Sequence, residues 1–113
     1  MQTFVRADEP QLIELGGGTS RKIRCYNEEM MLVEVIFETG AVGSDHSHPH
    51  TQISYVLEGE FTYPIEGVAH HMVKGDSIVV EGGRVHGCTC LAAGTLLDVF
   101  TPMREDFVAP SAI

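Results

Sequence analysis

Short β-rich segments alternate with glycine-containing turns along almost the whole chain, and this spacing restricts the fold more than any other feature of the sequence. Short strands with turns about every 8–12 residues are typical of antiparallel sandwiches and barrels. We therefore expect a single all-β domain over residues 1–113, with residues 1–10 as an N-terminal arm and one helical turn at 104–107. The expected strands are 11–15, 20–26, 30–38, 53–57, 61–65, 69–73, 77–80, 84–90 and 95–101, with turns at 16–18, 27–29, 58–60, 66–67, 74–76, 81–83 and 93–94 and a connection at 39–44.

The charge balance of the chain argues against two classes of partner. Sixteen acidic residues against seven basic residues give a formal net charge of −9. Such a charge disfavours nucleic acid and anionic membrane surfaces as partners. No apolar run is long enough to cross a bilayer, and the first residues do not resemble a signal peptide. We therefore expect a cytoplasmic protein that binds neither nucleic acid nor membrane.

The three cysteines, Cys25, Cys88 and Cys90, are odd in number and lack the spacing of a zinc ribbon. A reduced compartment fits this usage best. Cys88 and Cys90 share strand parity with His86, which would allow them to lie near a site formed there. We favour the interpretation that they are small buried apolar residues.

Three of the six histidines fall at every second residue between positions 46 and 50. In an extended strand, residues two apart point to the same face, so His46, His48 and Gln52 are expected to face one space. Imidazoles that converge with an amide oxygen are suited to binding a metal. A His-x-His pair alone is equally compatible with a polar surface loop, but here it continues into Gln52 and an apolar strand, which favours the metal site.

A second segment supplies a further imidazole. Residues 75–86 read as a turn, a strand, a glycine turn and then His86. Together with the first cluster, His86 would give three nitrogens and one neutral oxygen, a set that suits a divalent transition metal such as nickel, zinc, manganese, iron or cobalt. His50 has the same parity and is the rival ligand, but Pro49 is expected to displace it to a supporting position. His70 and His71 lie beside a turn and are expected to be solvated.

Both segments resemble the two conserved motifs of the cupin superfamily. The resemblance implies a small single-domain cupin, a double-stranded β-helix or jelly-roll barrel, with a metal inside and a homodimeric assembly. It spans about residues 30–101, with the first motif at 43–59 and the second at 75–90. The motif positions are His46-x-His48-x3-Gln52-x6-Gly59 and Gly75-x5-Glu81-x-Gly83-x2-His86, and the departures from the usual pattern are Gln52 for a carboxylate, Glu81 for Pro and Cys90 for Asn.

The end of the chain places Asp98 and Phe100 on one strand face, with Arg104 shortly after Pro102. A carboxylate on an otherwise apolar strand is costly to bury without a partner or a function. This tail, together with the first histidine motif, resembles the uronate-linearising cupins of the KdgF type. The resemblance implies metal-dependent conversion of 4,5-unsaturated monouronates from pectin or alginate to linear 5-keto-4-deoxyuronate. In that reaction Asp98 would move a proton, Arg104 would bind the small anionic sugar and Phe100 would pack against its ring.

Two other functions remain open at this point. One is a cupin dioxygenase that uses a redox metal, which would consume oxygen. The other is a non-catalytic sugar-binding cupin, whose ligand affinity would not depend on Asp98. Fold alone does not choose among them, because cupins serve many chemistries.

Overall fold

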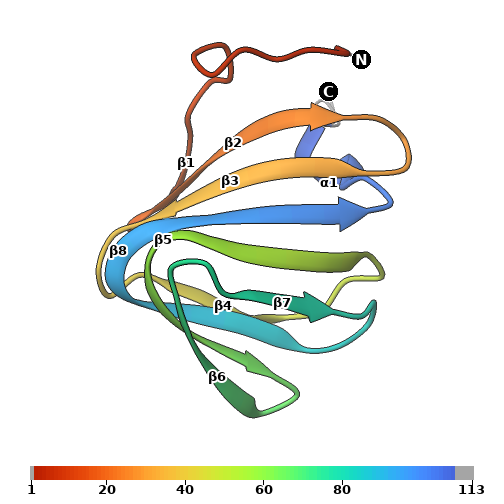
Figure 1. The fold of residues 1–113 in the computed structure, drawn as a ribbon. Helices are drawn as coiled ribbons and strands as arrows, with labels where there is room; N and C mark the ends of the chain where they lie inside the picture. Colours follow the sequence, from red (N-terminus) through yellow and green to blue (C-terminus); the bar gives the residue numbers. More distant parts are fainter. Residues whose placement is uncertain (1, 109–113) are drawn as a thin grey trace.

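The computed structural model describes residues 2–108, and in it eight antiparallel strands are followed by one short helix (Figure 1). The prediction of a single all-β domain of antiparallel strands is confirmed for these residues. Among these residues, no helix is long and apolar enough to span a bilayer. The elements are β1 (Ile13–Gly16), β2 (Thr19–Tyr26), β3 (Met31–Phe37), β4 (Val42–His46), β5 (Thr51–Ile65), β6 (Val68–Val73), β7 (Ser77–Val80), β8 (His86–Thr101) and α1 (Glu105–Val108).

The two longest strands, β5 and β8, pair with each other along most of their length and join the two halves of the barrel. The first half of β5 also pairs with β7, and its second half pairs with β6. In the same way, β8 pairs with β4 near its start and with β3 near its end. The sheet continues from β3 to β2 and β1. The barrel therefore has two layers, and β5 and β8 are long enough to contribute to both of them.

The turns predicted at 58–60 and 93–94 are wrong, because β5 and β8 continue through these residues without a break. At these positions the two strands bend against each other. Gly59 has a φ of 90°, and a Cβ atom there would lie 2.5 Å from the Ala92 carbonyl oxygen. A side chain on Gly94 would collide with the Glu58 carbonyl. These glycines mark a barrel corner with close backbone approach, which the sequence pattern does not distinguish from a turn.

Residues 42–46, predicted to lie mostly within a connection, form strand β4. Its sequence, with one glycine and three polar residues after Val42, has little strand propensity, so pairing with β8 is what holds it extended. The register of that pairing places His46 directly opposite His86.

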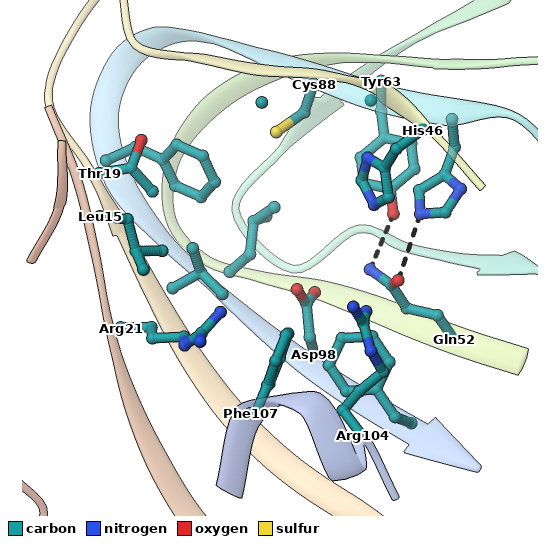
Figure 2. A pocket seen from close by; sticks show the side chains of 17 residues that line it. Leu15, Thr19, Arg21, His46, Gln52, Tyr63, Cys88, Asp98, Arg104 and Phe107 are labelled. Carbon is teal, nitrogen blue, oxygen red and sulfur yellow. Dashed lines mark hydrogen bonds between the residues drawn. The ribbon is translucent and has the colours of Figure 1, made fainter. Parts of the chain in front are cut away.

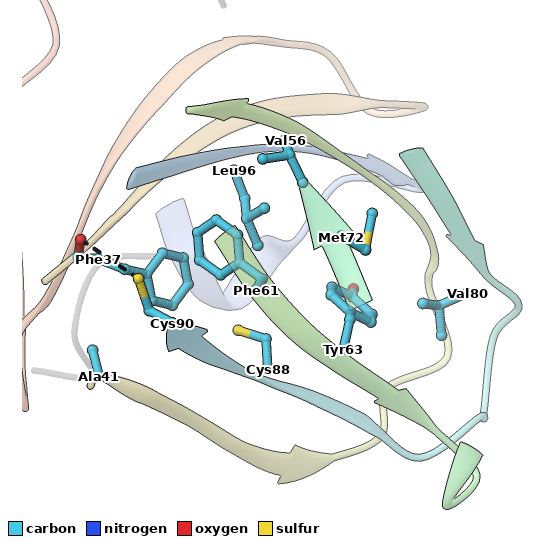
Figure 3. Close-up of a cluster of buried hydrophobic side chains, with 10 residues drawn as sticks. All are labelled: Phe37, Ala41, Val56, Phe61, Tyr63, Met72, Val80, Cys88, Cys90 and Leu96. Atoms are coloured by element: carbon cyan, nitrogen blue, oxygen red, sulfur yellow. Dashed lines mark hydrogen bonds between the residues drawn. The ribbon is translucent and has the colours of Figure 1, made fainter. Parts of the chain in front are cut away.

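The core lies between the two layers and continues under the end of β8. Phe37 and Phe61 meet edge to face with ring centroids 5.2 Å apart, and Val56 and Leu96 pack in the same cluster (Figure 3). Cys88 and Cys90 are buried in this cluster as free thiols. The prediction that both are small buried residues is confirmed.

Candidate metal centre and pocket

One end of the barrel holds a cavity of about 290 Å³, lined by residues from both layers and from the chain after β8 (Figure 2). This volume is at the lower end of the range for small-molecule sites, roughly 300–1,000 Å³. The histidine cluster lies at one side of the cavity and α1 at the other. The space suits one small ligand next to the histidines.

His46, His48 and His86 lie close together, with one ring nitrogen of each within 4.8 Å of the others. These three histidines do not converge by strand alternation, as the sequence pattern predicts. His46 and His48 do not share one strand, because β4 ends at His46 and β5 begins at Thr51. His46 and His86 meet across the β4–β8 pairing, with ring centroids 4.5 Å apart. His48 reaches them from the irregular segment between the strands.

The Nδ1 atom of each of these histidines faces a backbone carbonyl oxygen. The distances are 2.8 Å from His46 to Ser44, 3.1 Å from His48 to His50, and 3.0 Å from His86 to Arg84. A carbonyl oxygen only accepts hydrogen bonds, so Nδ1 carries the proton in all three rings. Such second contacts fix the tautomer of a metal-binding histidine. Each neutral imidazole therefore presents a bare Nε2.

The Gln52 amide oxygen faces the same space. Its Oε1 lies 3.0 Å from Nε2 of His48 and 3.3 Å from Nε2 of His86. Burial lowers the pKa of both imidazoles, which favours their neutral forms. In that state Oε1 and both Nε2 atoms are acceptors with no hydrogen between them. A cation among them satisfies all of these lone pairs, so the residues fit a divalent transition metal.

Hydrogen bonds to the nitrogen end of the Gln52 amide fix its orientation. Its Nε2 donates hydrogen bonds to the Ser54 hydroxyl (3.1 Å) and to the Tyr63 hydroxyl (3.2 Å). These contacts identify the nitrogen end of the amide and turn Oε1 toward the imidazoles. A buried network that fixes a ligand in this way is typical of metal sites.

His50 does not join the cluster, although its parity made it the rival ligand. Its backbone carbonyl accepts the hydrogen bond from His48, while its own Nδ1 is buried without a hydrogen-bond partner among residues 2–108. His50 thus supports His48 through the main chain. His70 and His71 are exposed on β6, as predicted.

Asp98 lies on the inner face of β8, where only 7% of its surface is exposed. The Ser54 hydroxyl donates a hydrogen bond of 2.6 Å to its Oδ1. Burial raises the pKa of Asp98 to about 6, partly offset by the hydrogen bonds that it accepts. The carboxyl group lines the same cavity as the histidines, next to Arg104 in Figure 2.

Arg104 and Phe100 also line the cavity. The Arg104 guanidinium lies 5.2 Å from the centre of the Phe100 ring. Its Nε and Nη2 donate to the two carboxylate oxygens of Asp106, at 3.0 and 2.8 Å. The Phe100 ring meets His48 edge to face, with centroids 5.8 Å apart. Six of the seven residues expected at the site therefore line this one cavity, and the seventh, His48, contacts its lining residues Gln52 and Phe100.

Sequence reasoning missed three residues of this site, namely Arg21, Ser54 and Tyr63. Ser54 has the same strand parity as Gln52, which is a usable signal. Tyr63 has the opposite parity to Gln52 and Ser54, and the register shifts of β5 between residues 56 and 61 bring its hydroxyl to the same place, so parity does not predict it. Arg21 is one of three basic residues in β2 and belongs to no motif, so nothing in the sequence distinguishes it from Lys22 or Arg24.

Comparison with known proteins identifies the class. The family model for the cupin domain matches residues 33–100, and the chain belongs to the cupin superfamily. Within that superfamily it resembles the pectin degradation protein KdgF of Dickeya dadantii (strain 3937), with 38% identity over 110 residues, covering 96% of this chain and 100% of the relative.

Solved structures agree with this relationship. KdgF from Halomonas sp. superposes with a TM-score of 0.88 at 34% identity, covering 95% of this chain and 99% of that one. An RmlC-like cupin from Shewanella frigidimarina gives a TM-score of 0.91 at 39% identity, covering 95% and 96%. The HTH-type transcriptional regulator PuuR of Escherichia coli (strain K12) is 32% identical over an alignment of 111 residues that covers 86% of this chain and 60% of the regulator.

Proposed function

We propose that this cupin converts 4,5-unsaturated monouronates to linear 5-keto-4-deoxyuronate without redox chemistry. The observation that carries the proposal is the buried Asp98 carboxyl group, which shares one small cavity with His46 and His86 of the three-histidine cluster. The near full-length similarity to KdgF, whose name refers to pectin degradation, supports the same substrate class. An unsaturated uronate from alginate would present the same reacting groups.

The reaction needs a proton to move and no electrons. The substrate ring is a hemiacetal whose ring oxygen also belongs to an enol ether. Loss of the C1 hydroxyl proton breaks the bond from C1 to the ring oxygen and gives an aldehyde. The released oxygen is then an enol at C5, and it becomes a ketone when C4 gains a proton. Starting material and product are isomers, so the atoms balance.

The residues of the cavity can perform these tasks. Asp98 would hold or move the proton between the oxygen and C4. Phe100 offers a ring face against which the sugar can pack, and the guanidinium groups of the cavity provide donors for its oxygens. His46, His48, Gln52 and His86 would hold the metal. A bound divalent cation supplies a Lewis acid that stabilises negative charge on a substrate oxygen.

The test is turnover of unsaturated galacturonate by the metal-loaded protein, followed by loss of ultraviolet absorbance with an oxygen electrode in the same cell. We expect a rate above the spontaneous one without oxygen uptake. Asp98→Asn should lower turnover roughly 100-fold or more while leaving metal content unchanged. Asp8→Asn, an exposed change in the N-terminal arm, is the matched control. Oxygen uptake coupled to substrate loss would replace this proposal with a dioxygenase.

Similarity to PuuR favours a second candidate, a sugar-binding cupin without turnover. In that case the protein would bind the uronate tightly and leave its absorbance unchanged. Asp98→Asn would then leave affinity as in the wild type.

A further inference from the structure

The cavity contains two guanidinium groups in different electrostatic situations. Arg104 is neutralised by Asp106, which accepts two hydrogen bonds from it. Arg21 has no ion pair with any carboxylate in the described part of the chain, residues 2–108. Its Nε is buried and has no hydrogen-bond partner there. A buried donor without a partner is costly, so one is expected when the site is occupied.

Packing holds Arg21 at the cavity. It lies in the middle of β2, opposite Val35 of β3, which also lines the cavity. Its guanidinium lies 3.7 Å from the centre of the Phe107 ring, and that of Arg104 lies 4.3 Å from the same centre. Figure 2 shows Phe107 between the two side chains. The aromatic ring positions the Arg21 group and leaves its hydrogen-bond donors for another partner.

The electrostatics of the cavity favour an anionic ligand there. Burial and the charge of Arg104 both lower the pKa of Arg21, and the charge of Asp106 offsets them only in part, so the positive charge of Arg21 is incompletely compensated. The protein as a whole carries a net charge of −9, so the positive charge in this cavity is opposite in sign to the charge of the protein. A ligand carboxylate would supply both the missing charge and the missing acceptor.

We infer that Arg21 binds the carboxylate of the ligand and makes the cavity selective for small organic acids over neutral sugars. The inference rests on the proposed function and deepens it by assigning the carboxylate to the β2 side of the cavity. Arg104, already held by Asp106, then serves mainly to support Phe100 and Phe107. A planar guanidinium matches a carboxylate with two parallel hydrogen bonds, which an ammonium group does not reproduce.

The experiment compares binding of galacturonate and galactose by calorimetry, in wild type, Arg21→Gln, Arg21→Lys and Lys22→Gln. Lys22 is next on the same strand and does not line the cavity, so Lys22→Gln makes the same charge change outside it. We expect Arg21→Gln to weaken galacturonate binding roughly 10- to 100-fold and to leave galactose binding unchanged. Arg21→Lys should recover part of the loss, and Lys22→Gln should match wild type. Equal metal content and unfolding temperature establish that the variants are folded.

Three outcomes would overturn the inference: no galacturonate binding by wild type, unchanged galacturonate affinity in Arg21→Gln, or equal loss for galacturonate and galactose. The two proposals fail separately. A wild type that binds galacturonate through Arg21 but does not turn over unsaturated uronates refutes the proposed function alone. An active Arg21→Gln enzyme with unchanged KM refutes the inference alone, since lost ground-state binding should raise KM and spare kcat.

Discussion

Replacing Ser54 with Ala should destabilise the protein more than its size suggests, because this hydroxyl connects the buried Asp98 carboxyl group with the Gln52 amide. Ser54 is fully buried. It donates to Asp98 at 2.6 Å, accepts from Gln52 at 3.1 Å and contacts the Tyr63 hydroxyl at 3.0 Å. Ala removes all three contacts and leaves their partners buried.

The magnitude follows from these contacts. A hydrogen bond to a charged group contributes about 1.5–3 kcal/mol, and a neutral one about 1 kcal/mol. Gln52 and Tyr63 keep their own hydrogen bond of 3.2 Å, so the two neutral contacts together contribute about as much as one. We therefore expect a loss of about 2.5–4 kcal/mol, a large part of the roughly 5–15 kcal/mol that stabilises a typical domain. For a chain of 113 residues this corresponds to a fall in Tm of roughly 10 °C.

The assay is urea unfolding of metal-free protein in the presence of a chelator, so that metal binding does not add to stability. A double-mutant cycle with Asp98→Asn isolates the pair, and the double variant should lose less than the two single losses combined. Ser20→Ala, a buried serine of β2 outside this network, is the matched control. A loss below about 0.5 kcal/mol for Ser54→Ala, or strict additivity in the cycle, would refute the reasoning.

Other predictions concern the metal, the thiols and the outer surface. His86→Ala should abolish metal retention measured by elemental analysis, and wild-type metal content in that variant would rule out the proposed ligand set. Iodoacetamide should modify the partly exposed Cys25 before the buried Cys88, whose thiol pKa is raised to about 12 by burial, and peptide mapping with equal rates would contradict this order. We predict a homodimer that covers the exposed apolar side chains of β5. Tyr55→Asp should therefore shift the sedimentation coefficient toward that of the monomer, and a wild type that sediments as a monomer would contradict the prediction.

The sequence predicts the barrel well because glycine turns and alternating strands are local signals. It does not predict that β5 and β8 are continuous, because a glycine at a barrel corner looks the same as a glycine in a turn. Gly59 and Gly94 are placed by their contact with each other's strands, which is a long-range property.

The histidine cluster was predicted through an incorrect local model. His46 and His48 lie on different segments, and pairing between β4 and β8 brings His46 to His86. The motif was informative because the fold that accompanies it supplies this pairing. The surroundings of Arg21 could not be predicted, because the lack of an ion pair with it among residues 2–108 is a property of the three-dimensional structure. Neither spacing nor composition carries that information.

The shared strands also have a kinetic consequence. Most pairings that build the site join segments far apart in the chain, such as β4 with β8 and β5 with β8. Domains dominated by such non-local pairings typically fold in milliseconds to seconds. The chain loses the entropy of loop closure before the stabilising contacts form, and this slows folding. His86 comes next to His46 only after β8 has docked. Capture of a metal ion by the complete set of ligands would therefore be among the last events of folding, and would report that both layers of the barrel have closed.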